Sequence, residues 1–284
     1  MTAPVMDMPQ TERRTLASRL HRFWRRPWFE KIFVLCDRIR MSFPGFPAPR
    51  RLPFGAWWLI RRGALDHELL AGTFETAELC FTERFLQPGM TVLDIGANHG
   101  LYTLLAAKCI GTKGRVFAFE PSPRERKRLR THLWLNRCTN AQIVPYALGS
   151  HISQADLYVV QGGQTGCNSL RPPQVNEPVA PTCVEIRTLD DFLKGEKLPR
   201  VDFIKMDVEG GELEVLQGAL KLFQGPRLPV LLVEVSDLRT AAWNYKAKEI
   251  LLFLQARGYD FFSVSANGAL VPVSISEEFM DANV

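Results

Sequence analysis

Short apolar segments alternate with helical segments from residue 91 to residue 273, and this alternation constrains the fold more than any other feature. Apolar strands separated by helices of about 10–15 residues are typical of βαβ units, whose parallel sheet is covered by helices on both faces. We therefore predict an α/β fold with a doubly wound, mainly parallel, seven-stranded sheet. The predicted strands are residues 91–95, 115–120, 142–148, 201–207, 229–235, 259–264 and 269–273.

An insertion over residues 149–200 interrupts this alternation between the third and fourth predicted strands. The stretches ADLYVV and TCVEIRTL alternate apolar and polar residues on either side of a loop-like segment. This pattern predicts a β-rich insertion, either an antiparallel excursion or a lid over the site. Ligands of doubly wound sheets bind at the carboxyl ends of the strands, which is the edge where the insertion leaves the sheet.

The loop after the first predicted strand indicates a nucleoside cofactor. In the segment VLDIGANHG (92–100), Asp94 precedes Gly96 and Gly100, and glycines allow a ligand to approach the backbone closely. Glu120 ends the second predicted strand, twenty residues beyond Gly100, and can accept from both ribose hydroxyls. A carboxylate at Asp94 would repel a pyrophosphate, but it suits a cofactor with a sulfonium and an ammonium group, such as S-adenosylmethionine (SAM). The alternative is an ordinary tight turn between strand and helix.

A set of motifs in a fixed order resembles the FkbM-type SAM-dependent methyltransferases. The resemblance covers roughly residues 70–265 and rests on GTFE (72–75), DIGANHGLYT (94–103), FEPSP (119–123), ALG (147–149), NSL (168–170), TLD (188–190) and IKMDVEG (204–210). It implies a class I methyltransferase (Rossmann-like) fold and methylation of a hydroxyl on a sugar, a natural product or a related small molecule. We therefore expect a basic, aromatic, helical N-terminal extension with a proline-rich connector over residues 1–69. A methyltransferase domain with its insertion at 149–200 is expected over residues 70–284.

The resemblance also implies roles for individual residues. Glu120 would bind the ribose, Ser122 would lie beside the adenine, and Glu75 of the upstream motif would belong to the cofactor site. Thr103 either bonds the amino-acid end of SAM or only packs in its helix. The residues expected to line the methionine part are Asp94, Gly96, Asn98 and Gly100. The residues expected to contact the substrate or close over it are Asn168 and Ser169.

Acidic residues follow two neighbouring strands where the reacting hydroxyl should lie. Asp207 and Glu209 follow the fourth strand, where Lys205 can pair with one of them, and Glu234 ends the fifth strand beside the substrate. In one mechanism, one of these acids, or His99, acts as the general base. In another, the three acids hold a Mg²⁺ ion that acidifies the hydroxyl. Alternatively, Asp207 and Glu209 cap the next helix.

The positive charge of the chain is concentrated near its start. The net charge is +5, but residues 1–51 hold 11 Lys and Arg against 4 Asp and Glu, and the remaining residues hold 24 against 26. Arginines and aromatic residues are mixed over residues 13–40. This pattern indicates a packing or homo-oligomer element, with a peripheral membrane or acidic partner as the alternative and nucleic acid as the least favoured contact.

The six cysteines contain no CxxC pair, and the chain starts without an apolar signal region. We therefore expect a cytoplasmic protein. The leading functional prediction is a SAM-dependent O-methyltransferase for a hydroxylated small-molecule or glycan-like acceptor. The alternatives are an RNA (ribose) methyltransferase that uses the basic arm, and a non-catalytic scaffold with a SAM fold. The presence of Asp94 and Glu120 disfavours the scaffold.

Overall fold

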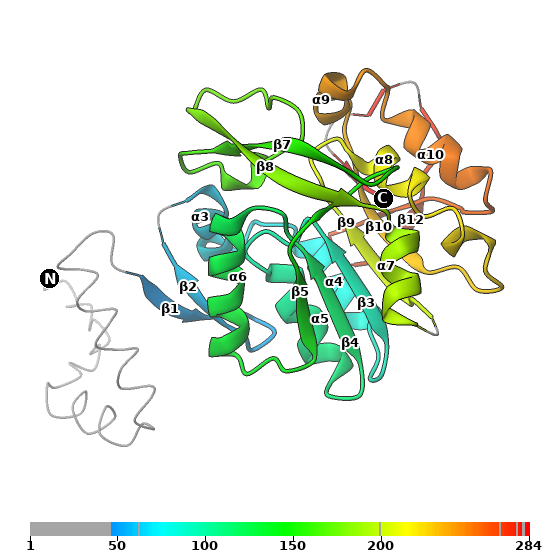
Figure 1. The fold of residues 1–284 in the computed structure, drawn as a ribbon. Coiled ribbons are helices and arrows are strands. Elements are labelled where there is room, and N and C mark those ends of the chain that lie inside the picture. The colour runs from blue at the N-terminus through cyan, green and yellow to red at the C-terminus, as the bar shows by residue number, and fades with distance from the viewer. Residues whose placement is uncertain (1–46, 62, 199, 267, 277, 280–281) are drawn as a thin grey trace, which may run out of the picture. The chain divides into compact units, whose positions relative to one another are not determined.

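The centre of the molecule is a six-stranded sheet in the order β13-β10-β9-β3-β4-β5 (Figure 1). The structure is a computed structural model that describes residues 47–61, 63–198, 200–266, 268–276, 278–279 and 282–284. Five neighbouring strands run parallel, and the edge strand β13 is antiparallel to β10. The strands are β3 (Thr91–Ile95), β4 (Arg115–Phe119), β5 (Ala141–Val144), β9 (Phe203–Met206), β10 (Val230–Val235) and β13 (Ala282–Asn283). The predicted doubly wound α/β fold is confirmed.

Helices cover both faces of this sheet because successive strand residues point to opposite sides. Val92 and Val116 pack with residues of α4 and α5, whereas Leu93 and Phe117 pack with residues of α7, α8 and α10. These helices are α4 (Thr76–Phe85), α5 (Leu101–Ile110), α7 (Leu189–Glu196), α8 (Glu212–Gln217) and α10 (Lys248–Gln255). The shorter α9 (Asp237–Thr240) follows β10.

The helix α6 (Pro123–Leu135) begins at the end of β4 with a strong start signal. Ser122 is its N-cap and accepts the backbone N–H of Glu125, and Pro123 occupies the first helical turn, where its missing N–H costs nothing. The strand β4 therefore passes within a few residues into a helix, which fixes the position of the chain around Glu120.

The insertion forms a separate three-stranded sheet, β6-β8-β7, beyond the carboxyl ends of the central strands (Figure 1). The predicted third strand, 142–148, is divided, because β5 ends at Val144 and residues 147–148 join this second sheet. The long pair β7 and β8 is antiparallel from Ser153 opposite Ile186 to Val160 opposite Val179. The predicted antiparallel excursion is therefore present. Its elements are β6 (Ala147–Leu148), β7 (Ser153–Val160), β8 (Val179–Arg187) and, between them, the single-turn helix η1 (Thr165–Cys167).

The last predicted strands do not join the central sheet, so its described strands number six where we predicted seven. β11 (Phe262–Val264) and β12 (Leu270–Pro272) instead pair with each other in a two-stranded antiparallel sheet. The short connection explains the difference, because Ser265 donates its backbone N–H to the Ala269 carbonyl and turns the chain back at once. The unpredicted β13 occupies the edge beside β10.

The described chain divides into two compact units. The described residues of the smaller unit are 47–49 and 59–61, and the larger unit holds residues 50–58 and everything described from 63 onward. Part of the predicted extension thus belongs to the larger unit. The elements at this end are β1 (Ala48–Arg51), β2 (Trp57–Ile60) and α3 (Ala64–Ala71).

Trp58 and Asp66 show how this N-terminal part of the larger unit is held. The indole of Trp58 donates to Asp66 at 2.8 Å and stacks on His132 of α6, with ring centroids 3.9 Å apart. Asp66 also binds Arg128 of α6. A buried carboxylate paired in this way fixes Trp58 and Asp66 on α6.

The basic Arg and aromatic segment lies outside the described residues, and so do the predictions made for it. Among the residues that the structure describes, no helix has the length and apolar character needed to span a bilayer.

Candidate active site

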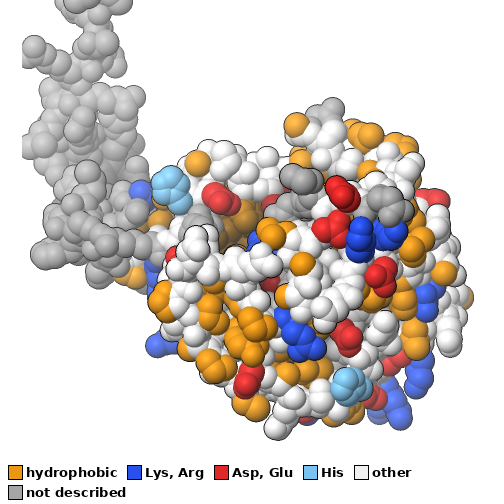
Figure 2. All heavy atoms as spheres, turned by 90° about the horizontal axis from the view of Figure 1, so that it is seen from above, with side chains coloured by type: hydrophobic (Ala, Val, Ile, Leu, Met, Phe, Trp, Pro, Cys, Tyr) orange, Lys and Arg blue, Asp and Glu red, His pale blue; other side chains and the backbone are white. Residues whose placement is uncertain are grey.

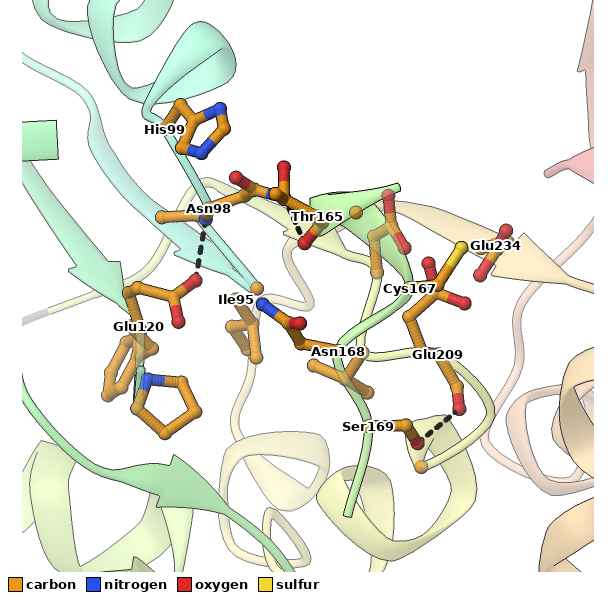
Figure 3. Close-up of a pocket in the computed structure, with 18 of the residues that line it drawn as sticks. Ile95, Asn98, His99, Glu120, Thr165, Cys167, Asn168, Ser169, Glu209 and Glu234 are labelled. Atoms are coloured by element: carbon orange, nitrogen blue, oxygen red, sulfur yellow. Dashed lines mark hydrogen bonds between the residues drawn. The ribbon is translucent and has the colours of Figure 1, made fainter. Parts of the chain in front are cut away.

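A cavity of about 440 Å³ opens at the carboxyl ends of the central strands. The ends of β3, β4, β9 and β10 form its floor, and the loop of residues 163–170 between β7 and β8 forms part of its wall. Figure 3 shows residues of this wall, Thr165 to Ser169, facing the floor residues Ile95 and Glu120. Residues from five segments far apart in the sequence therefore meet in one hollow.

Gly96 brings the first loop against the end of β9. It has φ +86°, and a Cβ atom there would lie 1.8 Å from the Asp207 carbonyl oxygen. The Asp207 backbone N–H also donates to the Ile95 carbonyl at 3.0 Å. Gly96 is therefore required by the packing of two strand ends, in addition to any ligand contact.

We expect Gly96→Ala to lower the free energy of unfolding by about 2–6 kcal/mol, because it adds a backbone clash to an unfavourable φ. Gly89→Ala is the matched control: Gly89 has a similar φ of +88°, but nothing lies within 4 Å of its added Cβ. That control should cost only about 1–2 kcal/mol. Urea unfolding of both variants measures the difference, and equal losses would contradict the close approach at Gly96.

Asp94 lies on the floor of the cavity and is buried. Its carboxylate accepts a hydrogen bond from the Thr103 hydroxyl, and burial raises its pKa to about 6. Thr103 is fully buried and is not among the described lining residues. Its hydroxyl thus orients Asp94, a contact that was not predicted, and both predicted roles of Thr103 stay predictions.

Glu120 is also buried, and its carboxylate organises the turn around it. Its two oxygens accept the backbone N–H groups of Asn98 and Ser122, each at 2.8 Å, and the first of these bonds is drawn in Figure 3. Burial raises the pKa of Glu120 to about 7. Each carboxylate oxygen has a second lone pair for a ligand hydroxyl.

Asn98 faces the cavity in a left-handed conformation, with φ +48°. Its amide nitrogen donates to the Thr165 carbonyl at 3.3 Å, and its buried amide oxygen has no partner among the described residues. Two predicted cofactor residues, Ser122 and Gly100, are not among the described residues that line the cavity. Ser122 is the N-cap of α6 and Gly100 is the N-cap of α5.

Three acids converge at the opposite side of the cavity, the arrangement that the Mg²⁺ alternative required. Asp207, Glu209 and Glu234 each place one carboxylate oxygen within 4.8 Å of the others. Burial, together with the neighbouring charge of Asp207, raises the pKa of Glu234 far above its usual value.

Two cations balance this acidic group. The buried Lys205 donates to Asp207 at 3.3 Å, as predicted, and to the Asn283 side chain at 3.2 Å. Burial alone would lower the pKa of Lys205, but Asp207 and Glu75 raise it above its usual value, so Lys205 is charged. Arg239 lies 3.0 Å from Glu209 and 4.0 Å from Glu234.

The helix-capping alternative for Asp207 and Glu209 is wrong. The N-cap of α8 is Gly211, and the side chain that accepts the backbone N–H groups of this turn is Glu212, from Val208 at 3.0 Å and Gly210 at 3.3 Å. Asp207 and Glu209 direct their carboxylates to Lys205 and Arg239 instead. Nothing in the sequence distinguished Glu212 from its acidic neighbours.

The predicted substrate residues Asn168 and Ser169 lie in the cavity wall and fasten the β7–β8 loop. Ser169 donates to the Glu209 carbonyl at 2.9 Å, a bond visible in Figure 3. Asn168 donates to Glu125 of α6 at 3.0 Å. The loop is thereby connected to the acidic turn on one side and to α6 on the other.

His99 shares Glu125 with this loop. Its Nε2 lies 3.1 Å from Glu125, and burial lowers its pKa. Figure 3 shows His99 on the far side of Asn98 from Glu209 and Glu234. The structure therefore brings the three acids together and places His99 apart from them.

Several cavity residues were not singled out from the sequence. Arg239 of α9 and Trp243 line the acidic side, and the Trp243 indole donates to the Glu209 carbonyl at 3.3 Å. Tyr102 donates to the predicted Glu75 at 2.6 Å, which fixes Glu75 in the wall. One sequence signal could have identified Arg239: it is a basic residue that follows soon after Glu234, the acid near the end of β10.

Comparison with known proteins identifies the domain that carries this cavity. The sequence profile described as the Methyltransferase FkbM domain matches residues 94–261, more than half of the chain. The chain belongs to the FkbM methyltransferase family. The resemblance noted in the sequence is therefore confirmed, and with it the assignment of this domain to the SAM-dependent methyltransferases.

Relatives of this FkbM methyltransferase include two curated enzymes. The 2-O-methyltransferase NoeI of Sinorhizobium fredii is 26% identical over 163 residues, covering 53% of this chain and 65% of NoeI. The hexuronic acid methyltransferase AglP of Haloferax volcanii is 27% identical over 133 residues, covering 46% of this chain and 50% of AglP. The alignments thus span less than two thirds of either relative.

Among solved structures, the Methyltransferase FkbM from Methylobacillus flagellatus KT matches with a TM-score of 0.45 and 17% identity. This match covers 78% of the present chain and 52% of that protein.

Proposed function

We propose that the protein transfers the methyl group of SAM to a hydroxyl of a small-molecule, sugar or natural-product acceptor. The observation that carries this proposal is one cavity with two acidic sides: Asp94 and Glu120 on the predicted cofactor side, and Asp207, Glu209 and Glu234 on the other. The names of NoeI and AglP, an O-methyltransferase and a hexuronic acid methyltransferase, support oxygen as the accepting atom and a sugar as the acceptor.

The residues on the cofactor side fit SAM. Glu120 offers two carboxylate oxygens to ribose hydroxyls, Asp94 offers a negative charge to a cationic group, and the unpartnered amide oxygen of Asn98 offers an acceptor for an N–H donor. SAM supplies the chemistry of an electrophilic methyl group on a positively charged sulfur. Within this proposal, Glu75 holds its place through Tyr102 on the same wall.

The residues on the acidic side must orient the acceptor hydroxyl and remove its proton. Asp207 suits this task because its side chain is 32% exposed and therefore reachable, while Lys205 fixes one of its oxygens. The β7–β8 loop, fastened through Ser169 and Asn168, forms the wall of the cavity beside this position. Proximity and a positioned base are the two contributions such a displacement needs.

Mg²⁺ fits the three acids poorly. Lys205 and Arg239 already bind Asp207 and Glu209, so a metal ion would have to compete with an ammonium and a guanidinium group for the same oxygens. We derive no step through a metal ion. Addition of EDTA should therefore leave the rate of methyl transfer unchanged, and a loss of activity that Mg²⁺ restores would contradict this assignment.

Cofactor affinity should increase as the pH rises. The pKa of Glu120 is raised by burial to about 7, and ribose hydroxyls bond best to its ionised form, so cofactor binding releases a proton below that pH. The affinity for S-adenosylhomocysteine should thus rise between about pH 6 and pH 8 and then level off. Calorimetric titration measures this, with Glu120→Gln as the control that removes the Glu120 contribution. An affinity of the native protein that falls over this range would contradict the role of Glu120.

The function is tested by incubating labelled SAM with neutral glycosides and with RNA in parallel. Figure 2 shows acidic and basic side chains interspersed with apolar ones on the described part of the face it displays, with no continuous basic area there. The described part of this face therefore presents no extended basic area for phosphate contacts, and the basic segment named in the RNA alternative lies outside the described residues. Label in a glycoside supports the proposal, and label in RNA alone overturns it.

A further inference from the structure

The charge of the cavity restricts the acceptor further. Resting on the proposed function, we infer that the acceptor carries no carboxylate or phosphate where it enters the cavity, and is a neutral or amine-bearing polyol. The acceptor class is thereby narrower than the family resemblance implies, and it excludes the hexuronic acid that the name of the relative AglP gives as its substrate.

The first observation is the excess of acids around the cavity. Among the described residues that line it, positive charge comes from Lys205 and Arg239, with the buried His99 as the remaining titratable base. Seven carboxylic acids line the same cavity: Glu68, Glu75, Asp94, Glu120, Asp207, Glu209 and Glu234. Two of these, Asp94 and Glu120, are assigned to SAM, whose sulfonium and ammonium groups outweigh its single carboxylate.

The second observation is that both lining cations are already engaged. Lys205 is buried and bonds to Asp207 and the Asn283 side chain. Arg239 lies against Glu209 and near Glu234, and it donates to the Cys167 sulfur at 3.7 Å. An anionic group entering the cavity would have to displace a carboxylate from one of these cations before it gained a partner.

The third observation is that the carboxyl groups themselves resist further negative charge. Burial and the proximity of Asp207 raise the pKa of both Glu75 and Glu234. Charges of one sign repel more strongly in a partly buried cavity than in water, because the effective dielectric constant is lower. A carboxylate on the acceptor would add to this repulsion, whereas hydroxyl and ammonium groups would donate hydrogen bonds to the same oxygens.

The acidic side also offers an apolar surface suited to the ring of a polyol. Trp243 lines the cavity, and its indole N–H is held by the Glu209 carbonyl. An aromatic side chain beside carboxylates combines a face for C–H groups with acceptors for hydroxyls. The Arg171 guanidinium already lies over the Trp243 ring, 4.7 Å from its centroid, but Arg171 is not among the described residues that line the cavity.

The test compares three acceptors of one shape: a methyl hexopyranoside, the corresponding hexuronate and its uncharged hexuronamide. Binding of each to the full chain saturated with S-adenosylhomocysteine is measured by calorimetry, and transfer from labelled SAM is measured in parallel. We expect the glycoside and the hexuronamide to bind at least about tenfold more tightly than the hexuronate and to show the same order in kcat/KM. Tighter or equal binding of the hexuronate overturns the inference.

A variant identifies the source of the discrimination. Glu209→Gln should narrow the ratio between hexuronamide and hexuronate binding, since it removes a carboxylate from the wall and takes away the partner of Arg239. Glu185→Gln on the exposed part of β8 should leave this ratio unchanged. A ratio that Glu209→Gln does not change counts against the charge argument. If the native chain binds S-adenosylhomocysteine but transfers no methyl group to any of the three acceptors, the proposed function is overturned instead. Methylation of the hexuronate as fast as the amide overturns only the charge inference.

Discussion

Glu120→Ala should weaken the binding of SAM and S-adenosylhomocysteine by about 10²–10⁴-fold, because a hydrogen bond to a charged group contributes about 1.5–3 kcal/mol and a ribose forms two. The carboxylate is buried at the carboxyl end of β4, facing the cavity, and no other described acid occupies that strand end. Calorimetric titration of the purified variant with S-adenosylhomocysteine measures the loss directly.

The controls for this variant separate cofactor binding from folding. Glu120 also accepts the N–H groups of Asn98 and Ser122, so its removal lowers stability as well. Glu120→Gln keeps the side-chain volume and removes the charge, and Glu185→Ala removes an exposed acid that pairs only with Arg187. We expect binding to fall in both Glu120 variants and to stay normal in Glu185→Ala. A dissociation constant for Glu120→Ala within about threefold of the native value would remove Glu120 from the cofactor site.

Asp207→Asn should reduce kcat by about 10²–10⁴-fold, the usual contribution of a general base, while cofactor binding stays within about threefold. The substitution keeps the shape of the side chain, and the backbone of residue 207, which packs against Gly96, is unchanged. Single-turnover transfer from labelled SAM measures the rate, and titration with S-adenosylhomocysteine measures binding.

The matched control for Asp207 is Asp191→Asn. Asp191 is an exposed acid in the first turn of α7, bonded to Thr188 and remote from the lining residues. It should retain the native rate. Retention of the native rate by Asp207→Asn would assign the proton transfer to another group, and loss of cofactor binding would move Asp207 to the cofactor side.

The central fold was predictable because its determinants are local. The strands β3, β4 and β9 are short apolar runs, and each is followed by a turn and a helix. Such a pattern has few arrangements that bury both faces of a sheet. The prediction for the two C-terminal strands was wrong because local information is insufficient there. An isolated apolar run such as β12 does not specify whether it pairs with a neighbouring hairpin strand or with the central sheet.

The site was predictable where a residue's role depends on its place at a strand end. Asp94, Glu120 and the three acids of the rim lie at such positions, and they line one cavity. The roles of Thr103 and Ser122 depend instead on which side chain or N–H group comes within bonding distance. Thr103 turns its hydroxyl to Asp94 and Ser122 caps α6.

Long-range contacts account for the residues that sequence patterns did not reveal. Arg239 reaches Glu209 across thirty positions of the chain, and Asn168 reaches Glu125 across 43. A single sequence carries no record of such pairs. The contact of His99 with Glu125 could not be predicted for the same reason. The predicted role of His99 as a base stays a prediction.

The central claim, that this FkbM methyltransferase methylates a hydroxyl of an uncharged polyol, is tested most directly by the product itself. SAM carrying a ¹³C-labelled methyl group is incubated with the full chain and a panel of neutral glycosides, and the products are examined by NMR. We expect a new methyl ether, with the labelled carbon bonded to oxygen, that forms about 10²–10⁴-fold more slowly with Asp207→Asn. A labelled methyl bonded to nitrogen or carbon, or no product while SAM is bound, would contradict it.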